Sequence, residues 1–275
     1  MELELAALVV LGVAIGAYGT VVGAGGGFIL VPVLLIAYPD MAPDEVTSIS
    51  LGVVFVSAMS GSVGYARRHR IDYTTGLIFA GASIPGVVAG ALIVGYIPQR
   101  LFTGLFGLLL LAVAVASLRG RTQAIREPLR GPGVVRRLVV DEEGRQYVYA
   151  YKLWQGVAMS VGVGLVSSLF GIGGGVVSVP VMTMLLHMPV QFATATSLFA
   201  VSFMSGNATA IHVATRTFSE QELLKTAALA VGALVGAQAG TRIAERVKGR
   251  VVLMMLASAL GVLSLRLLLR AVFGF

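Results

Sequence analysis

The chain has 275 residues, of which 57% are hydrophobic and 12% are charged, and its formal net charge is +7. Because soluble domains carry about 25% charged residues, this composition excludes a soluble globular fold. The sequence contains no cysteine, which excludes disulfide bonds and thiolate metal sites.

Three long stretches lack any Asp, Glu, Lys or Arg: Val46–Ala66, Tyr73–Gln99 and Leu153–Thr215. About 20 apolar residues in a helix span a bilayer core, so the longest stretch must contain at least two spans. The sequence therefore predicts an all-α polytopic protein of the cell membrane. The first residues, MELELAAL, are acidic and lack the basic region of a cleavable signal peptide, so we expect the first apolar segment to be retained.

Division of the chain at charged or turn-rich stretches gives about eight transmembrane segments: 3–37, 43–66, 73–96, 101–118, 153–187, 191–215, 221–241 and 251–272. The first and the fifth are too long to cross as straight helices. Their 35 residues each would reach about 50 Å, against a hydrocarbon core of about 30 Å. Each contains a run of glycines, and we expect its helix to break there.

The glycine runs lie in two matching stretches, GAGGGFILVPVL at 23–34 and GIGGGVVSVPVM at 171–182. A broken helix leaves free N–H groups and a positive N-terminus, which together suit an anion. The alternative interpretation is close packing of small residues between membrane helices. The candidate substrate-binding residues in these runs are Gly25, Gly26, Gly27 and Pro32, with Gly173, Gly174, Gly175 and Pro180.

The two stretches are landmarks of an internal repeat. Matching residues recur in order at a separation of 146 to 148 positions, which apolar sequence of low complexity rarely produces by chance. The pairs are Gly25 and Gly173, Pro32 and Pro180, Ser50 and Ser197, and Gly86 and Gly232. The sequence thus predicts transmembrane repeats at 1–118 and 153–275, with four segments each. Since four is even, we expect parallel repeats related by an axis along the membrane normal.

Hydroxyl side chains gather in the segment after each glycine run. Most can be explained by hydrogen bonds to their own helix backbone, but those at matching positions in the two halves are better candidates for binding. The polar candidates are Ser48, Ser50, Thr196 and Ser197, together with Asn207 and with His212, which could contact an anion or carry a proton.

Several kinds of chemistry have no support in the sequence. No Asp or Glu lies inside an expected span away from its ends, so we expect no carboxylate proton relay or sodium site. No metal-ligand cluster and no Ser–His pair with a nucleophile motif occurs in a span. We therefore expect no metal, no cofactor and no enzymatic activity.

The connection 119–152 is the one stretch that resembles soluble protein. Its sequence RLVVDEEGRQYVYAY places two β-rich runs around a polar turn, which predicts a cytoplasmic β-hairpin; a disordered linker is the alternative. With the N-terminus inside, fifteen Lys and Arg residues fall on the cytoplasmic side and five outside. This asymmetry predicts that both termini are cytoplasmic, although the basic loop 242–250 argues against it. The basic balance indicates anionic lipid as the partner, and not nucleic acid.

The repeated G-x-G-G-G run, the proline after it and the T-S-L-like signatures ending at Leu51 and Leu198 resemble the TauE/SafE family of sulfite and organosulfur anion permeases. The resemblance covers nearly the whole chain except 119–152. It implies a permease for a small anion such as sulfite, and it highlights the glycines and prolines above with Ser48, Ser50, Thr196 and Ser197. We expect export driven by the membrane potential. An anion channel, a proton-coupled carrier and a non-transporting scaffold or accessory subunit are the alternatives.

Overall fold

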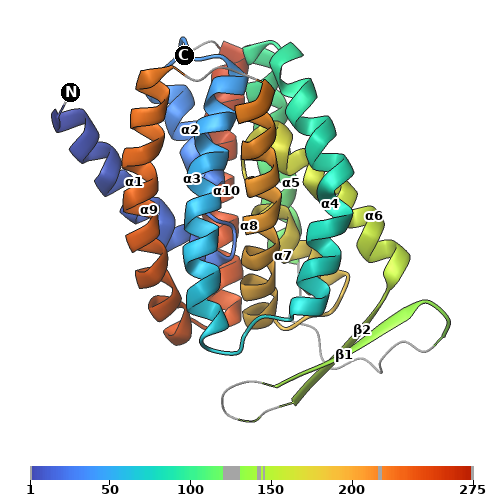
Figure 1. Cartoon of the computed structure of the whole chain (residues 1–275). Coiled ribbons are helices and arrows are strands. Elements are labelled where there is room, and N and C mark those ends of the chain that lie inside the picture. The colour runs from blue at the N-terminus through green and yellow to red at the C-terminus, as the bar shows by residue number, and fades with distance from the viewer. Residues whose placement is uncertain (1, 120–130, 141–143, 145, 216–218, 274–275) are drawn as a thin grey trace.

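A computed structural model describes residues 2–119, 131–140, 144, 146–215 and 219–273 of the chain. Two strands, β1 (Val134–Val140) and β2 (Gln146–Lys152), accompany a helical bundle (Figure 1). The helices are α1 (Glu2–Val22), α2 (Gly27–Ala37), α3 (Pro43–Ala66), α4 (Tyr73–Ile93), α5 (Gln99–Arg119), α6 (Leu153–Phe170), α7 (Gly175–Met184), α8 (Val190–Thr215), α9 (Glu220–Arg246) and α10 (Gly249–Phe273), with a 3₁₀ turn at Val94–Tyr96.

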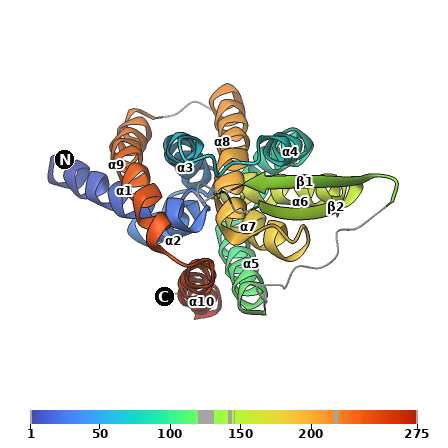
Figure 2. The same ribbon diagram turned by 90° about the horizontal axis from the view of Figure 1, so that it is seen from below.

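In the described part of the chain, seven helices are long and apolar enough to cross a membrane: α1, α3, α4, α5, α6, α9 and α10. The remaining long helix, α8, is rich in hydroxyl side chains. It lies between α3 and α4 (Figure 2), and part of its surface is exposed, at Phe203 and Val213. Helices α2 and α7 have 11 and 10 residues, which is too short to cross the bilayer core.

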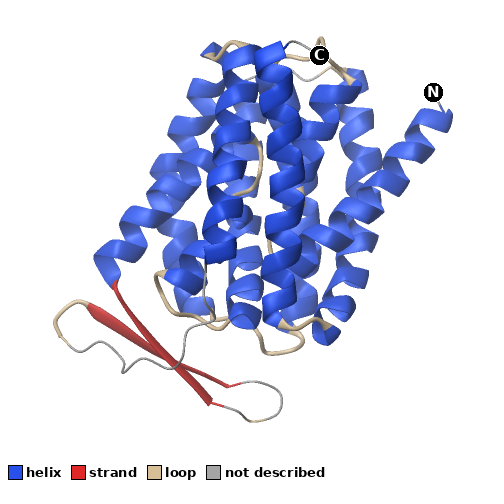
Figure 3. Cartoon of the chain, turned by 180° about the vertical axis from the view of Figure 1, so that it is seen from behind, coloured by secondary structure: helices blue, strands red, loops and turns tan. Residues whose placement is uncertain are grey.

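The first long segment returns to the side from which it starts. In Figures 1 and 3, α1 descends from the end of the bundle that carries both termini, and α2 turns back toward that end. Helix α3 then crosses to the opposite end, α4 crosses back, and α5 crosses again. We call the end with the chain termini the terminus face, and the end with the β-hairpin the hairpin face.

The second half follows the same course from the other side. Helix α6 rises from the hairpin face, α7 returns to it, and α8, α9 and α10 cross in turn to end at the terminus face (Figure 1). Each half therefore has three crossing helices and one returning pair. The prediction of parallel repeats is wrong, because it counted each long segment as one crossing and so gave an even number.

The returning pairs also correct the expected sidedness. The start of α1 and the end of α10 lie on one face of the bundle, and the hairpin lies on the opposite face (Figure 3). The turn between α9 and α10, which contains Lys248, lies on the hairpin face with the turn that contains Arg67. A topology with the termini and the 119–152 connection on the same side is therefore wrong, and the basic loop 242–250 now joins the other basic segments.

Glycines bring neighbouring helices into backbone contact. Helix α1 lies along α9, and α6 lies along α4. A Cβ at Gly236 would lie 2.1 Å from the carbonyl oxygen of Val13, and one at Gly86 would lie 2.0 Å from that of Val161. These distances leave no room for a side chain, so these glycines serve close helix packing.

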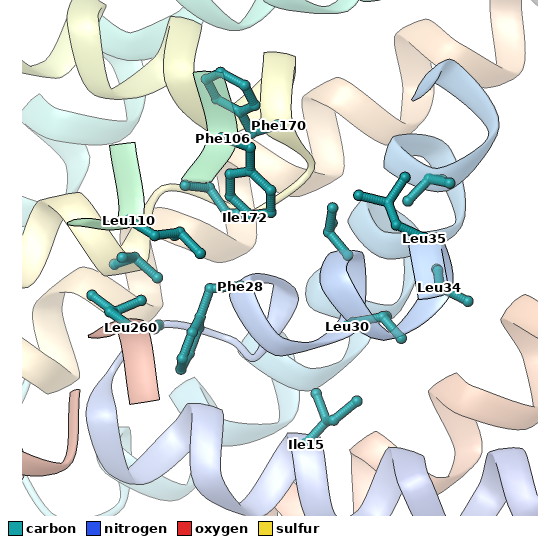
Figure 4. Packing of buried hydrophobic residues seen from close by; sticks show 14 of the residues in the cluster. Ile15, Phe28, Leu30, Leu34, Leu35, Phe106, Leu110, Phe170, Ile172 and Leu260 are labelled. Carbon is teal, nitrogen blue, oxygen red and sulfur yellow. The ribbon is translucent and has the colours of Figure 1, made fainter. Parts of the chain in front are cut away.

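The apolar core joins the two returning pairs to α5 and α10. Figure 4 shows Phe28 of α2 and Leu260 of α10 in the same cluster as Ile172, between α6 and α7. Phe106 of α5 stacks on Phe170 of α6, with ring centroids 5.3 Å apart and planes 13° apart. The breaks in the two long segments are therefore held inside the bundle by packing from both halves.

Strands β1 and β2 pair antiparallel, from Val134 opposite Lys152 to Val140 opposite Gln146. The ribbon lies beside the start of α6 on the hairpin face (Figure 2). Residues 120–130 of the connection, and 141–143 and 145 of the expected turn, lie outside the described residues.

Candidate functional site

Two breaks in the helices meet near the middle of the bundle. The first separates α1 from α2 at residues 23–26, and the second separates α6 from α7 at residues 171–174. The left-handed backbone regions are occupied at Gly23, Gly25, Gly26, Gly171, Gly173 and Gly174, with φ values of 78°, 72°, 92°, 68°, 72° and 82°. Only glycine adopts these values without strain, which explains why the runs are made of glycine.

The two breaks touch each other beside α3 and α8, which we call the central helices. A Cβ at Gly27 would lie 2.6 Å from the carbonyl oxygen of Gly171, and one at Gly175 would lie 2.5 Å from that of Gly23. The glycines between them face the same two side chains. A Cβ at Gly25 or Gly173 would meet Val54 of α3 and Val201 of α8.

One serine from each central helix holds the opposite break. Ser50 of α3 donates its hydroxyl to the carbonyl oxygen of Gly171 at 2.6 Å, and Ser197 of α8 donates to that of Gly23 at 3.1 Å. A helix end leaves carbonyl groups without partners, and a buried carbonyl without a partner is costly. The two serines satisfy that need reciprocally.

Amide donors remain open at the start of each returning helix. In the described part of the chain, the N–H groups of Gly27 and Phe28, and of Gly175 and Val176, donate no backbone hydrogen bond outside their helices. These groups are the positive ends of α2 and α7. Pro32 and Pro180 lie inside those two helices and are buried.

A buried hydroxyl group adds to the donors of the second break. Ser167 Oγ has no hydrogen-bond partner among the described residues, and its Cβ lies 3.2 Å from where a Cβ of Gly174 would be. Irregular backbone at membrane depth persists only where protein or a wet cavity surrounds it. Among the described residues nearest to these glycines there is no carboxylate, so the donors without partners are of the chemical type that suits an anion.

Four of the sequence candidates lie elsewhere. Ser48 donates to the backbone of its own helix at Asp44, 2.7 Å away. Thr196 accepts a hydrogen bond from the Asp72 backbone N–H at 3.0 Å. Asn207 is exposed and donates to Phe203 of its own helix at 2.8 Å.

His212 is buried in the last turn of α8. It lies 15 residues beyond Ser197, which is about 22 Å along a helix axis. The structure therefore does not bring His212 to the glycine breaks.

A charged cluster that sequence reasoning missed joins the hairpin to the bundle. Asp72, which precedes α4, accepts hydrogen bonds from Arg137 Nε at 2.9 Å and from Arg137 Nη2 at 2.8 Å. It also accepts from the Tyr149 hydroxyl and, at 3.1 Å, from the Thr75 hydroxyl. This geometry is a bidentate arginine–carboxylate pair, the strongest form of such a contact.

The same contacts set the ionisation of the cluster. Burial opposes the charge of Asp72, but hydrogen bonds from Arg137 and Tyr149 outweigh it, so the pKa of Asp72 is lowered. Burial and the bond to Asp72 raise the pKa of Tyr149. The signal in the sequence was the alternation of tyrosines in QYVYAY, which places Tyr147, Tyr149 and Tyr151 on one face of β2.

The model of the family described as "Sulfite exporter TauE/SafE" matches residues 8–267. The chain is 29% identical over 274 residues to "Probable membrane transporter protein YunE" of Bacillus subtilis, covering 97% of this chain and 98% of that protein. It is 26% identical over 278 residues to "Probable membrane transporter protein MJ0441" of Methanocaldococcus jannaschii, covering 97% and 96%. No solved structure matches the chain significantly.

Proposed function

Because the chain belongs to the sulfite exporter TauE/SafE family, we propose that it exports a small oxyanion, sulfite or a related organosulfur anion, through a site at the two glycine breaks. The observation that carries this proposal is the pair of breaks in contact at the centre of the bundle, each with open backbone N–H groups. Such groups at a helix N-terminus bind anions.

The contacts between the halves support a mechanism of alternating access. The Ser50–Gly171 bond in one half has its counterpart in the Ser197–Gly23 bond of the other. Three crossing helices and a returning pair in each half make the halves inverted copies, related by an axis in the membrane plane. In transporters built this way, the substrate lies at the repeat interface and the halves exchange conformations to open each face in turn.

The distribution of basic residues supports an orientation. Among the described residues, eleven Lys or Arg lie toward the hairpin face and four toward the terminus face. The eleven are Arg67, Arg68, Arg70, Arg119, Arg136, Arg137, Lys152, Arg242, Arg246, Lys248 and Arg250, and the four are Arg100, Lys225, Arg266 and Arg270. Basic residues favour the cytoplasmic side, so the hairpin is cytoplasmic and both termini are outside.

Export needs no coupling ion. An interior-negative potential of 100 mV favours exit of a monovalent anion by about 2.3 kcal/mol, which corresponds to roughly a 40-fold outward gradient. An importer would have to overcome this energy. Among the described residues, no carboxylate is one of the nearest neighbours of the glycines in the breaks, and this favours electrogenic export.

A proton-coupled carrier is the second candidate, because His212 is a buried titratable residue in α8. Efflux of sulfite from proteoliposomes at clamped potential separates the two. Electrogenic export predicts that efflux follows the voltage and persists without a pH gradient and in His212→Gln. Efflux that ignores the voltage, follows the proton gradient and disappears in His212→Gln would establish the carrier instead. A channel would show no saturation with sulfite, and a scaffold would show no efflux.

A further inference from the structure

A largely buried arginine on the hairpin face has no partner among the residues that the structure describes. Arg70 is 9% exposed, and no acceptor among the described residues receives a hydrogen bond from its guanidinium. Burial of a charge is costly unless the charge is paired. The remaining exposed part of Arg70 can therefore take a counter-ion from solution.

The two neighbouring arginines show that the position of Arg70 is specific. Arg68 pairs with Glu245 and also donates to the carbonyl oxygen of Thr241. Arg67 is exposed to solvent. His69 adopts a left-handed conformation with φ of 52°, which turns the chain back under α3, and the Arg70 backbone N–H bonds the Tyr65 carbonyl oxygen at 3.3 Å.

Arg70 lines a narrow cavity where the ends of α1 and α3 meet the start of α8 and the turn between α9 and α10. The cavity measures about 10 Å³, room for one water-sized group. Of its ten lining residues, Arg70 is the only charged one. Tyr65, Gln191 and Thr194 are the other polar side chains of the wall. With one cation and no carboxylate, the lining is suited to one oxygen of an oxyanion.

The inner wall of this cavity belongs to the first glycine break. The Cα of Thr194 lies 2.6 Å from where a Cβ of Gly23 would be. The Tyr65 hydroxyl donates to the Thr20 carbonyl oxygen, in the last turn of α1, at 3.0 Å. Residues that contact the break therefore also line the cavity of Arg70.

We propose that Arg70 binds the oxyanion on the hairpin face before it reaches the glycine breaks, and that this loading site exists on that face alone. The proposal rests on the transport function proposed above. At the separation of 147 that relates Ser50 to Ser197, the second half has Thr217 in place of Arg70. The matching position in the second half is thus uncharged, although Arg216 comes directly before it, and we expect the two faces to bind the same anion with different affinity.

Uptake into membrane vesicles of both orientations tests this asymmetry, with orientation assigned by protease access to the hairpin. In Arg70→Gln, the half-saturating sulfite concentration on the hairpin side should rise about 10- to 100-fold, as expected when a charge-assisted hydrogen bond is lost. On the terminus side it should change less than about threefold. Arg70→Lys should give a smaller rise, and the exposed control Arg67→Gln should match the wild type.

A wild-type concentration dependence in folded Arg70→Gln, or an equal change on both sides, would overturn the loading site while the transport function stands. If the wild type moves no sulfite, calorimetric titration of the purified protein with sulfate tests separately whether the Arg70 site binds an anion. Sulfate binding that weakens at least tenfold in Arg70→Gln, but not in Arg67→Gln, would support the Arg70 site without the transport function. Absence of binding would overturn both.

Discussion

Glycine has three different roles in this chain, which the surroundings of each glycine distinguish. In the two breaks, φ lies between 68° and 92°. At Gly86 and Gly236, a Cβ would lie within 2.1 Å of a carbonyl oxygen of the neighbouring helix. At Gly162 in α6, no atom lies within 4 Å of where a Cβ would be, so nothing in its surroundings requires a glycine. The register of the two runs predicts where the helices break, but a sequence carries no φ value and cannot by itself separate these roles.

The register of Ser50 and Ser197 also predicts their importance but not their task. The sequence suggests that they bind an anion, whereas in the structure each donates its hydroxyl to a carbonyl oxygen of the opposite break. This role depends on contacts 121 and 174 residues apart in the chain. No local pattern predicts such contacts.

Loss of either serine hydroxyl should destabilise the breaks. Ser50→Ala and Ser197→Ala each leave a buried carbonyl without a partner, which costs about 1–3 kcal/mol. We expect a lower Tm of the purified protein and slower sulfite efflux in both variants. The control Ser258→Ala removes an exposed hydroxyl that bonds only its own helix, at Met255, and should leave both unchanged. Equal Tm values in all three variants would contradict the role assigned to the serines.

At the scale of the element, the hairpin is attached to the bundle by a small number of strong contacts. Arg137 of β1 and Tyr149 of β2 converge on Asp72, and Tyr147 packs on Phe192 of α8 with ring centroids 5.7 Å apart. The alternating β-rich sequence predicts these strands. Their docking partner was not predictable, because Asp72 lies 65 residues before Arg137.

Removal of the arginine charge should release the hairpin without unfolding the bundle. In Arg137→Gln, we expect amide hydrogen exchange in β2 to accelerate at least tenfold, because the bidentate pair with a buried carboxylate is lost. Arg136→Gln is the matched control, since Arg136 is the exposed neighbour on the same strand. Equal protection of β2 in the two variants would show that the pair does not hold the hairpin.

The docking should depend on pH only near the extremes. The pKa of Asp72 is lowered in the folded protein, so its contribution is present above its unfolded pKa of about 3.9 and is lost as the pH falls through the lowered value. The pKa of Tyr149 is raised, so its contribution is present below about pH 10 and is lost at higher pH. Hydrogen exchange in β2, corrected for intrinsic rates, should therefore stay constant between pH 5 and pH 9. A fall in protection near pH 6.5 would implicate a histidine instead.

At the scale of the whole molecule, the sequence predicts the segments well and their directions poorly. The expected boundaries at 43–66 and 73–96 match α3 and α4 with its 3₁₀ turn. The error lay in the two long segments, because a broken helix can either cross or return and hydropathy is the same in both cases. One such choice in each half reversed the expected direction of the helices that follow it.

The chain contains no cysteine, so single cysteines can report its orientation. Gly144→Cys lies in the hairpin and Asp40→Cys lies between α2 and α3, and both positions are exposed. In intact cells, a membrane-impermeant maleimide should label Asp40→Cys, on the terminus face, and should leave Gly144→Cys unlabelled until the cells are opened. The reverse pattern would place the hairpin outside, and labelling of both positions in intact cells would contradict the placement of the two faces on opposite sides.

Calorimetric titration of sulfite into the purified protein measures whether a small anion binds at the glycine breaks. Gly174→Ala places a Cβ at a residue with φ of 82°, beside the open N–H groups of α7. The control Gly162→Ala adds the same atom in α6, at a position where no other atom lies within 4 Å. We predict that the wild type and Gly162→Ala bind sulfite with the same Kd and that folded Gly174→Ala binds it at least tenfold more weakly. Wild-type affinity in folded Gly174→Ala would contradict binding of the anion at the breaks.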